Sequence, residues 1–429
     1  MENRFCLFFL FFFAQQAFAN IDIEQWQTSN NVPVYFVENH NLPMVDVSVN
    51  IQAGSAQDFE NKAGLAALTQ ALLAKGAADM DENTISEKLA DLGAVFNGSV
   101  SRTHTELNFR TLKENQNATL SIFLDVLTQP FFLEKVFQRE RANLRLELQD
   151  ALTRPHVLTR RAFTRALYPQ HPFGELVSAQ TLSNITRDDL LEFHRRFYVA
   201  SNLKIVIVGD LSIQEAQKMA EKIAFALPFG EKTPEINAPL PKESKENIIL
   251  IHPATQSHIL MGQITIARNH PDYFPLLAGN YILGGGGFSS RLMQEVREKE
   301  GLAYSVYSAF SADAHSGTFE IALQTERSQA QKALKLIHNI VENLIKNGIS
   351  PADLNTAQAY LSGSFPLNLD SNKKVLRQVV HIAQLDLPLD TLNTWQEKIQ
   401  ALTVEKVNAA LKKHLQPHTF LTVQTDAKK

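Results

Sequence analysis

The chain has 429 residues, a net charge of −4 at pH 7 and a single cysteine. This length exceeds what one hydrophobic core usually serves, and it suits two to four units of about 100–200 residues each. The charges form no long basic or acidic block, so nucleic acid is not a favoured partner. One cysteine cannot form an internal disulfide, so stability must come from packed cores.

The first 19 residues have the pattern of a secretory signal peptide. Arg4 precedes an apolar run over residues 7–13, and Ala17-Phe18-Ala19 supplies the small residues that signal peptidase recognises. The run is shorter than the roughly 20 apolar residues that a membrane-spanning helix needs, and no later stretch has that length. We expect residues 1–19 to be removed on export, and a buried N-terminal helix is the alternative.

The first half of the mature chain shows an ordered series of strand and helix patterns. Strands are expected over residues 45–53 and, as a pair, over 93–110. Thr186 is a predicted N-cap for the helix that follows it, and residues 203–210 predict a strand. Residues 228–245 are rich in proline and charge, which is typical of an extended linker.

The second half repeats this order after about 200 residues. A strand is expected over 259–266, two more over 303–324, and another over 419–426 after a helix capped by Thr403. The spacing from cap to strand end is 210 − 186 = 24 residues in the first half and 426 − 403 = 23 in the second. We therefore predict two α+β domains, over 20–227 and 246–429, joined by the linker 228–245. Two unrelated α/β domains are the alternative.

One helical segment resembles the metal helix of the insulinase/pitrilysin (M16) zinc peptidases. Residues 64–76 have the sequence Gly-Leu-Ala-Ala-Leu-Thr-Gln-Ala-Leu-Leu-Ala-Lys-Gly, whereas the family pattern is Gly-Leu-Ala-His-x-x-Glu-His-x-x-x-x-Gly. In the family, the two histidines bind zinc and the glutamate takes a proton from zinc-bound water. The three positions here are Ala67, Gln70 and Ala71. Methyl groups donate no lone pair and an amide is no base near pH 7, so we expect no cofactor in this chain.

The region of the third zinc ligand is retained. Glu147 lies 147 − 71 = 76 residues beyond Ala71, where the family has its last ligand, and Glu140 matches a second acidic position on the same helix. One carboxylate alone does not hold zinc tightly. The plainer interpretation is that both are ordinary acids on a helix surface.

The second half resembles the M16 peptidases at two residues that act on the substrate in that family. Within the stretch 283–305, Arg297 and Tyr304 are seven residues apart, as are an Arg and a Tyr of the family. The resemblance implies that they bind the substrate backbone and stabilise the oxyanion, a task that suits a permanent cation and a phenol donor. The alternatives are a surface cation for Arg297 and strand packing for Tyr304.

Asn97, Gly98 and Ser99 occupy the place of the family's substrate-binding edge strand. An extended peptide could add there through backbone hydrogen bonds. A turn or bulge at this place is the alternative. The histidines show no metal spacing, and Pro417 argues against a shared helical face for His414 and His418.

The resemblance covers nearly all of the mature chain and implies a fold and a role. The fold is a tandem of M16 domains (LuxS/mitochondrial-processing-peptidase-like), each a mostly antiparallel sheet with helices on one face, around a shared chamber. The role is a non-catalytic periplasmic subunit that supplies Arg297 and Tyr304 to a homologous zinc-bearing chain, with unfolded peptides as substrates. A homodimer, a peptide-binding scaffold without a part in hydrolysis, and an enzyme with unrecognised zinc ligands are the alternatives.

Overall fold

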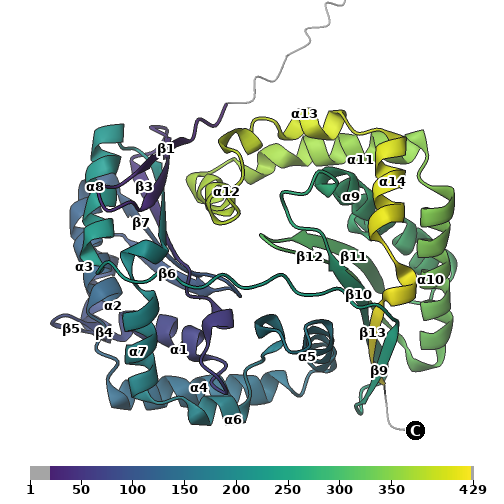
Figure 1. Ribbon diagram of the computed structural model, residues 1–429, viewed down its shortest axis with the longest axis horizontal. Helices are drawn as coiled ribbons and strands as arrows, with labels where there is room; N and C mark the ends of the chain where they lie inside the picture. Colours follow the sequence, from purple (N-terminus) through teal and green to yellow (C-terminus); the bar gives the residue numbers. More distant parts are fainter. Residues whose placement is uncertain (1–19, 427–429) are drawn as a thin grey trace, which may run out of the picture.

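The computed structural model describes residues 20–426 and shows two halves side by side, each with a sheet backed by helices (Figure 1). The expected signal peptide, residues 1–19, lies outside the described residues. Within the part of the chain that is described, no helix is both long and apolar enough to cross a membrane.

The sheet of the first half has the strand order β1-β2-β8-β3-β7-β6. All of its neighbouring strands are antiparallel except β2 and β8, which run parallel. A small ribbon, β4-β5, lies apart from it. The strands are β1 (Glu24–Gln27), β2 (Pro33–Glu38), β3 (Met44–Ile51), β4 (Gly76–Ala77), β5 (Met80–Asp81), β6 (Val95–Val100), β7 (Thr105–Leu112) and β8 (Leu203–Gly209). The helices are α1 (Leu65–Leu72), α2 (Glu82–Asp91), α3 (Gln116–Thr128), α4 (Glu134–Ala151), α5 (Pro155–Leu167), α6 (Ala179–Asn184), α7 (Arg187–Phe197) and α8 (Ile213–Ala226).

The sheet of the second half has the order β9-β13-β10-β12-β11. Its only parallel pair in the described residues is β9 with β13. The strands are β9 (Glu246–Ile251), β10 (Gln256–Thr265), β11 (Ser305–Ala312), β12 (Gly317–Glu326) and β13 (Leu421–Asp426). The helices are α9 (Tyr273–Asn280), α10 (Ala330–Asn347), α11 (Pro351–Ser364), α12 (Asn372–Gln384), α13 (Trp395–Gln400) and α14 (Val404–His414), with two π-helical segments, Tyr281–Gly285 and Met293–Lys299.

The two strand orders confirm the internal repeat. The order β2-β8-β3-β7-β6 of the first sheet matches β9-β13-β10-β12-β11 of the second, and the parallel pair falls at the same place in both. The predicted caps are also confirmed, because Thr186 accepts the N–H of Asp189 and Thr403 accepts that of Lys406. Between the halves, residues 227–245 run as an extended connection.

Each sheet buries one face under a helix of the other half. In β8, Ile205 and Ile207 point into the core of the first half, whereas Val206 and Val208 point to the opposite face, as the alternation of a strand requires. That opposite face packs against α12, which the second half supplies (Figure 1). The α12 residues in this cluster are Val375, Leu376, Val379, Val380, Ile382 and Ala383.

The reverse contact involves α5 of the first half and the sheet of the second. Phe163 and Leu167 of α5 pack against Leu260 of β10 and against Leu421 and Val423 of β13. A fully buried aliphatic or aromatic side chain of this size stabilises a fold by about 1.5–3 kcal/mol. The sequence did not predict this exchange of helices, which couples the two halves through apolar contacts.

The N-cap residue of helix α1 has no side chain that could cap the helix. Gly64, at the N-cap position, has no side chain and a φ of 107°, a backbone conformation that favours glycine. The cap comes from Asp58, whose Oδ2 accepts the N–H of Gly64 and whose Oδ1 accepts that of Ala66, both at 2.7 Å. Burial raises the pKa of Asp58 to about 7, against the opposing effect of these two N–H donors.

We predict that Asp58→Ala lowers the free energy of unfolding by about 1–2 kcal/mol, because it leaves two N–H groups at the start of α1 without an acceptor. Asp58→Asn should lose less, since the amide oxygen still accepts one of them. Urea unfolding at pH 7 measures both values. Equal stability of Asp58→Ala and the parent would show that Asp58 does not hold α1.

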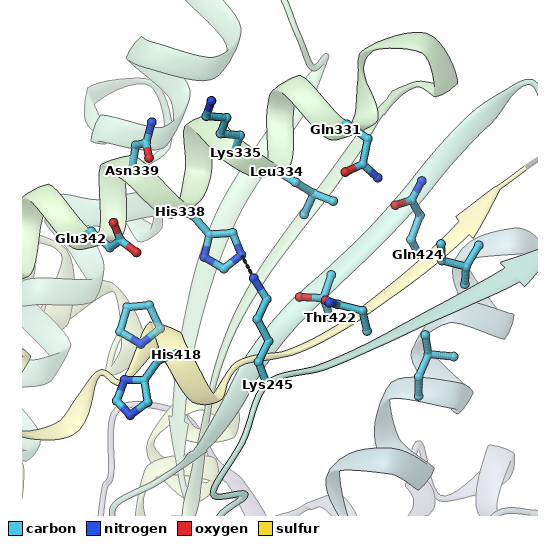
Figure 2. A pocket seen from close by; sticks show the side chains of 14 residues that line it. Lys245, Gln331, Leu334, Lys335, His338, Asn339, Glu342, His418, Thr422 and Gln424 are labelled. Carbon is cyan, nitrogen blue, oxygen red and sulfur yellow. Dashed lines mark hydrogen bonds between the residues drawn. The ribbon is translucent and has the colours of Figure 1, made fainter.

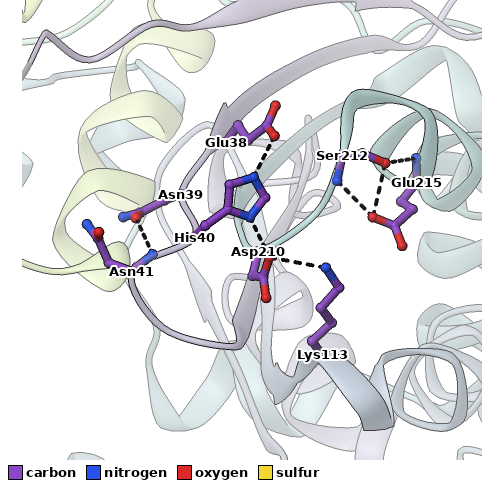
Figure 3. Close-up of polar contacts among 8 residues, drawn as sticks. All are labelled: Glu38, Asn39, His40, Asn41, Lys113, Asp210, Ser212 and Glu215. Carbon is purple, nitrogen blue, oxygen red and sulfur yellow. Dashed lines mark hydrogen bonds and ion pairs between the residues drawn. The ribbon is translucent and has the colours of Figure 1, made fainter.

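A cluster of charges ties together the ends of three strands of the first sheet (Figure 3). His40 lies 2.6 Å from Glu38, at the end of β2, and 2.5 Å from Asp210, directly after β8. Lys113, after β7, lies 3.1 Å from Asp210. The hydrogen bonds to Asp210 and then Glu38 raise the pKa of His40, so the imidazolium is the form that the cluster favours.

Because the folded pKa of His40 is raised, its contribution to stability is fully present below the unfolded value near 6.5 and is lost as the pH rises through the folded value. We expect the stability difference between the parent and His40→Gln to be larger at pH 5.5 than at pH 9, as measured by urea unfolding at low salt. His315→Gln, at another exposed histidine, is the control. A difference that does not change with pH would contradict the role of His40.

Candidate functional site

The three former ligand positions share one accessible face of α1. Ala67, Gln70 and Ala71 are spaced as i, i+3 and i+4, so they lie together, and each is at least partly exposed. The opposite face, which includes Leu65 and Leu68, is buried. The face is thus presented as in a metal helix, but its side chains are two methyl groups and one amide. These residues do not fit a zinc ion.

Gln70 is used for packing against β6. A Cβ atom on Gly98 would collide with the side-chain amide of Gln70 and would lie 2.9 Å from Cδ2 of Leu107. The glycine therefore allows α1 and β6 to approach closely. Asn97 and Ser99, the neighbours of Gly98, point to the other face of the strand and are exposed.

The strand that contains these three residues is regular and lies at the edge of its sheet. Within residues 20–426, β6 pairs only with β7, in an antiparallel register that sets Asn97 opposite Asn108. Its outer edge offers backbone N–H and C=O groups in the geometry that an added strand requires. The structure therefore has an edge strand here, not a turn or a bulge.

The two carboxylates on α4 have different surroundings. Glu140 forms an ion pair with Arg139 at 2.8 Å, and Arg139 also binds Glu82 of α2 at 2.6 Å. Glu147 is exposed and forms no ion pair within residues 20–426. Glu140 is thus part of a surface ion network, whereas Glu147 remains available on a helix that packs against α1.

Arg297 and Tyr304 lie together and form a clamp with a third residue. The guanidinium carbon of Arg297 is 5.0 Å from the ring centroid of Tyr304 and 4.9 Å from that of Phe288. Such contacts hold the cation through the ring faces and leave its N–H groups free to donate. In the described part of the chain the Arg297 side chain forms no ion pair or hydrogen bond. Sequence reasoning missed Phe288, which no motif singled out.

The clamp is open to solvent. Tyr304 is 82% exposed and Phe288 is 63% exposed, although large aromatic side chains usually bury most of their surface. Both sit on short connections: Tyr304 directly precedes β11, and Phe288 follows Gly287, whose φ of 58° favours glycine. The exposed rings, with the donors of Arg297, form a surface that can contact a carbonyl or an anion.

A cavity of about 440 Å³ lies where the two halves meet. It is lined by α5 from the first half and by β10, β11 and β12 from the second, and it includes Ser305 and Tyr307, close to Tyr304 in the chain. Arg160 of α5 lines it and pairs with Glu320 of β12. Both halves therefore contribute to this space, and Tyr304 directly precedes Ser305, one of its lining residues.

A second pocket, of about 530 Å³, lies on the other face of the second sheet (Figure 2). It is lined by α10 and by Thr422 and Gln424, which alternate along β13 with the residues that contact α5. Lys245 and His338 meet there at 3.2 Å. The sheet separates this pocket from α5 and its cavity, so it is a different surface.

Two family models match the chain. Residues 34–179 match the insulinase (peptidase family M16) model, and residues 184–361 match the model described as the peptidase M16 inactive domain. The first contains α1 and β6, and the second contains Arg297 and Tyr304.

Similar proteins are found over most of the chain's length. The non-peptidase homolog YmxG of Helicobacter pylori is 26% identical over 92% of this chain and 93% of that protein. An uncharacterized zinc protease of Rickettsia bellii is 30% identical over 72% of this chain and 74% of its own length. A crystal structure described as a peptidase M16 inactive domain, from Pseudomonas fluorescens, superimposes with a TM-score of 0.91 at 32% identity and covers 95% of this chain and 98% of that one. The chain therefore belongs to the M16 (insulinase) family, and its α1 has Ala67, Gln70 and Ala71 at the positions of the family's His-x-x-Glu-His motif.

Proposed function

We propose that this protein is the non-catalytic subunit of a periplasmic M16 peptidase, and that it supplies Arg297 and Tyr304 to the zinc site of a homologous partner. The observation that carries the proposal is the contrast between two surfaces of one chain. The α1 face offers two methyl groups and one amide, which suit neither a zinc ion nor the removal of a proton from water. In contrast, the guanidinium of Arg297 lies against two exposed rings and has no ion pair within residues 20–426. A protein without a part in hydrolysis has no need of such a clamp.

In the proposed complex the partner's zinc supplies the activated water. When water attacks a peptide carbonyl, negative charge develops on the carbonyl oxygen, and donors fixed beforehand near that position stabilise it. The guanidinium of Arg297 and the hydroxyl of Tyr304 are such donors, and the contact with Phe288 limits the freedom of the arginine. Because Tyr304 is 82% exposed, a second chain or a substrate can reach it.

Unfolded peptides are the proposed substrates. The outer edge of β6 could bind an extended peptide through main-chain hydrogen bonds, with Asn97 and Ser99 exposed beside it. This mode is largely independent of the peptide's side chains, so it suits a peptidase of broad specificity. The proposed location follows from the signal-peptide pattern of residues 1–19.

We expect Arg297→Ala to lower the peptidase activity of the mixture with the zinc-bearing homologue about 10²–10³-fold, the usual cost of losing an oxyanion donor. Arg297→Lys should lose part of the activity, because lysine keeps the charge but not the planar contact with the rings. Cleavage of a quenched fluorescent peptide measures the rates.

Lys299→Ala is the matched control, because Lys299 is an exposed cation of the same segment that pairs with Glu295. Rates that Arg297→Ala leaves unchanged would remove the proposed role. An inactive mixture in which the chain still binds extended peptides would instead favour a scaffold. Strong zinc-dependent cleavage by the lone chain would overturn the assignment as a non-catalytic subunit.

A second prediction tests whether only the ligands of α1 are missing. We expect a zinc site to form together with Glu147 in a chain that combines Ala67→His, Gln70→Glu and Ala71→His. The reason is that α4, which carries Glu147, already packs against α1. We expect one zinc equivalent more than the parent binds, as measured by metal analysis after dialysis. Glu147→Ala in the same chain should remove that additional equivalent. No gain of zinc would show that the scaffold, too, has lost the geometry.

A further inference from the structure

Three potential metal ligands meet in the second half, away from α1. His270 and Asp272 lie in the connection before α9, and His414 is the last residue of α14. One ligand atom from each lies within 4.8 Å of the other two. Two of the three residues are close in the chain and the third is 142 positions from Asp272, so no local motif could reveal the group.

The carboxylate of Asp272 lies at the centre of this group. Its Oδ2 is 2.7 Å from Nε2 of His414 and 3.8 Å from Nδ1 of His270. The two imidazole rings have centroids 5.0 Å apart and are nearly perpendicular, at 84°. Two nitrogens and one oxygen therefore lie close enough together to be bound by one ion.

The orientation of Asp272 has no explanation in its own helix. Asp272 is the N-cap residue of α9, a position where aspartate normally accepts an N–H of the first turn. Its side chain makes no such bond. It turns instead toward His414 and toward Lys413, whose Nζ is 3.0 Å away.

The packing of α9 on α14 fixes the positions of the ligands. A Cβ atom on Gly279 of α9 would lie 2.7 Å from Cδ2 of Leu411, one turn before His414. The two helices thus pack closely, at a point seven residues after Asp272 in α9 and three residues before His414 in α14. The ligands are partly buried, with side-chain exposures of 31% for His270, 27% for Asp272 and 13% for His414. They are held in place, yet an ion could still reach them.

We propose that His270, Asp272 and His414 bind a divalent transition-metal ion of the zinc type. Two imidazoles and one carboxylate are a common donor set for zinc, whereas magnesium and calcium prefer oxygen ligands. The ion would take the place of the proton in the hydrogen bond between His414 and Asp272. It would also bind Nδ1 of His270, which now accepts a hydrogen bond from the backbone N–H of Asp272 at 3.0 Å, and that hydrogen bond would break. Water would fill the remaining position.

Lys413 competes with the ion for the same carboxylate. Its side chain is 63% exposed and flexible, so it can turn into solvent when a cation arrives. The site would connect the segment before α9 to the end of α14. It shares no residue with the α1 face or with the clamp, and it is independent of the proposed role of Arg297.

Titration of the chelator-treated full chain with Zn²⁺, followed by calorimetry, tests the proposal. We expect one equivalent to bind, and His414→Ala and His270→Ala each to weaken that binding by at least about 10-fold. His418→Ala, at an exposed histidine four residues further on, is the matched control and should bind as the parent does. Lys413→Ala should bind at least as tightly as the parent, because it removes the competing cation.

Thermal unfolding provides a second measurement of zinc binding, because it compares each variant with and without Zn²⁺ and so does not depend on the variant's own stability. Zn²⁺ should raise the Tm of the parent and of His418→Ala, but not that of His414→Ala. Absence of binding, equal binding of Mg²⁺ and Zn²⁺, or binding unaffected by both histidine variants would overturn the proposal. None of these outcomes bears on the activity of the mixture, which tests the proposed function separately.

Discussion

The exchange of helices between the halves is the constraint on which the rest of the structure depends. Each sheet has apolar side chains on both faces, and its own helices cover only one of them. The second face of the first sheet, with Val206 and Val208, is buried by α12, and that of the second sheet is buried by α5. Neither half can therefore bury its apolar surface without the other. This requirement fixes how the two halves are oriented.

The two halves differ in the side chains that they present at their candidate sites. The scaffold of α1 remains, with its distant cap at Asp58 and its packing on Gly98, although its ligands are gone. The second half has the clamp, in which Arg297 contacts the rings of Phe288 and Tyr304. The buried residues of α1 show that this helix serves the fold although it has no metal ligands, and the proposed function therefore relies on the second half.

The sequence predicted the features that depend on local patterns. Thr186 and Thr403 cap their helices as expected, because capping involves residues three apart. The features it missed depend on residues that meet only in the folded chain. Asp58 caps α1 from outside the helix, and His414 meets Asp272 across 142 positions. The sequence did contain one signal for the cap from Asp58: Gly64, directly before α1, has no side chain that could cap the helix.

The connection 227–245 has a consequence of its own. It is extended, yet Thr233 is buried and donates its backbone N–H to Asn202 at 2.7 Å, so the segment follows the surface of the first half. The interlocked helices hold the two halves together whether or not this peptide is continuous. A protease that cut the segment would produce two polypeptides that still co-purify, and the molecule is in this sense a non-covalent assembly that happens to be encoded as one chain.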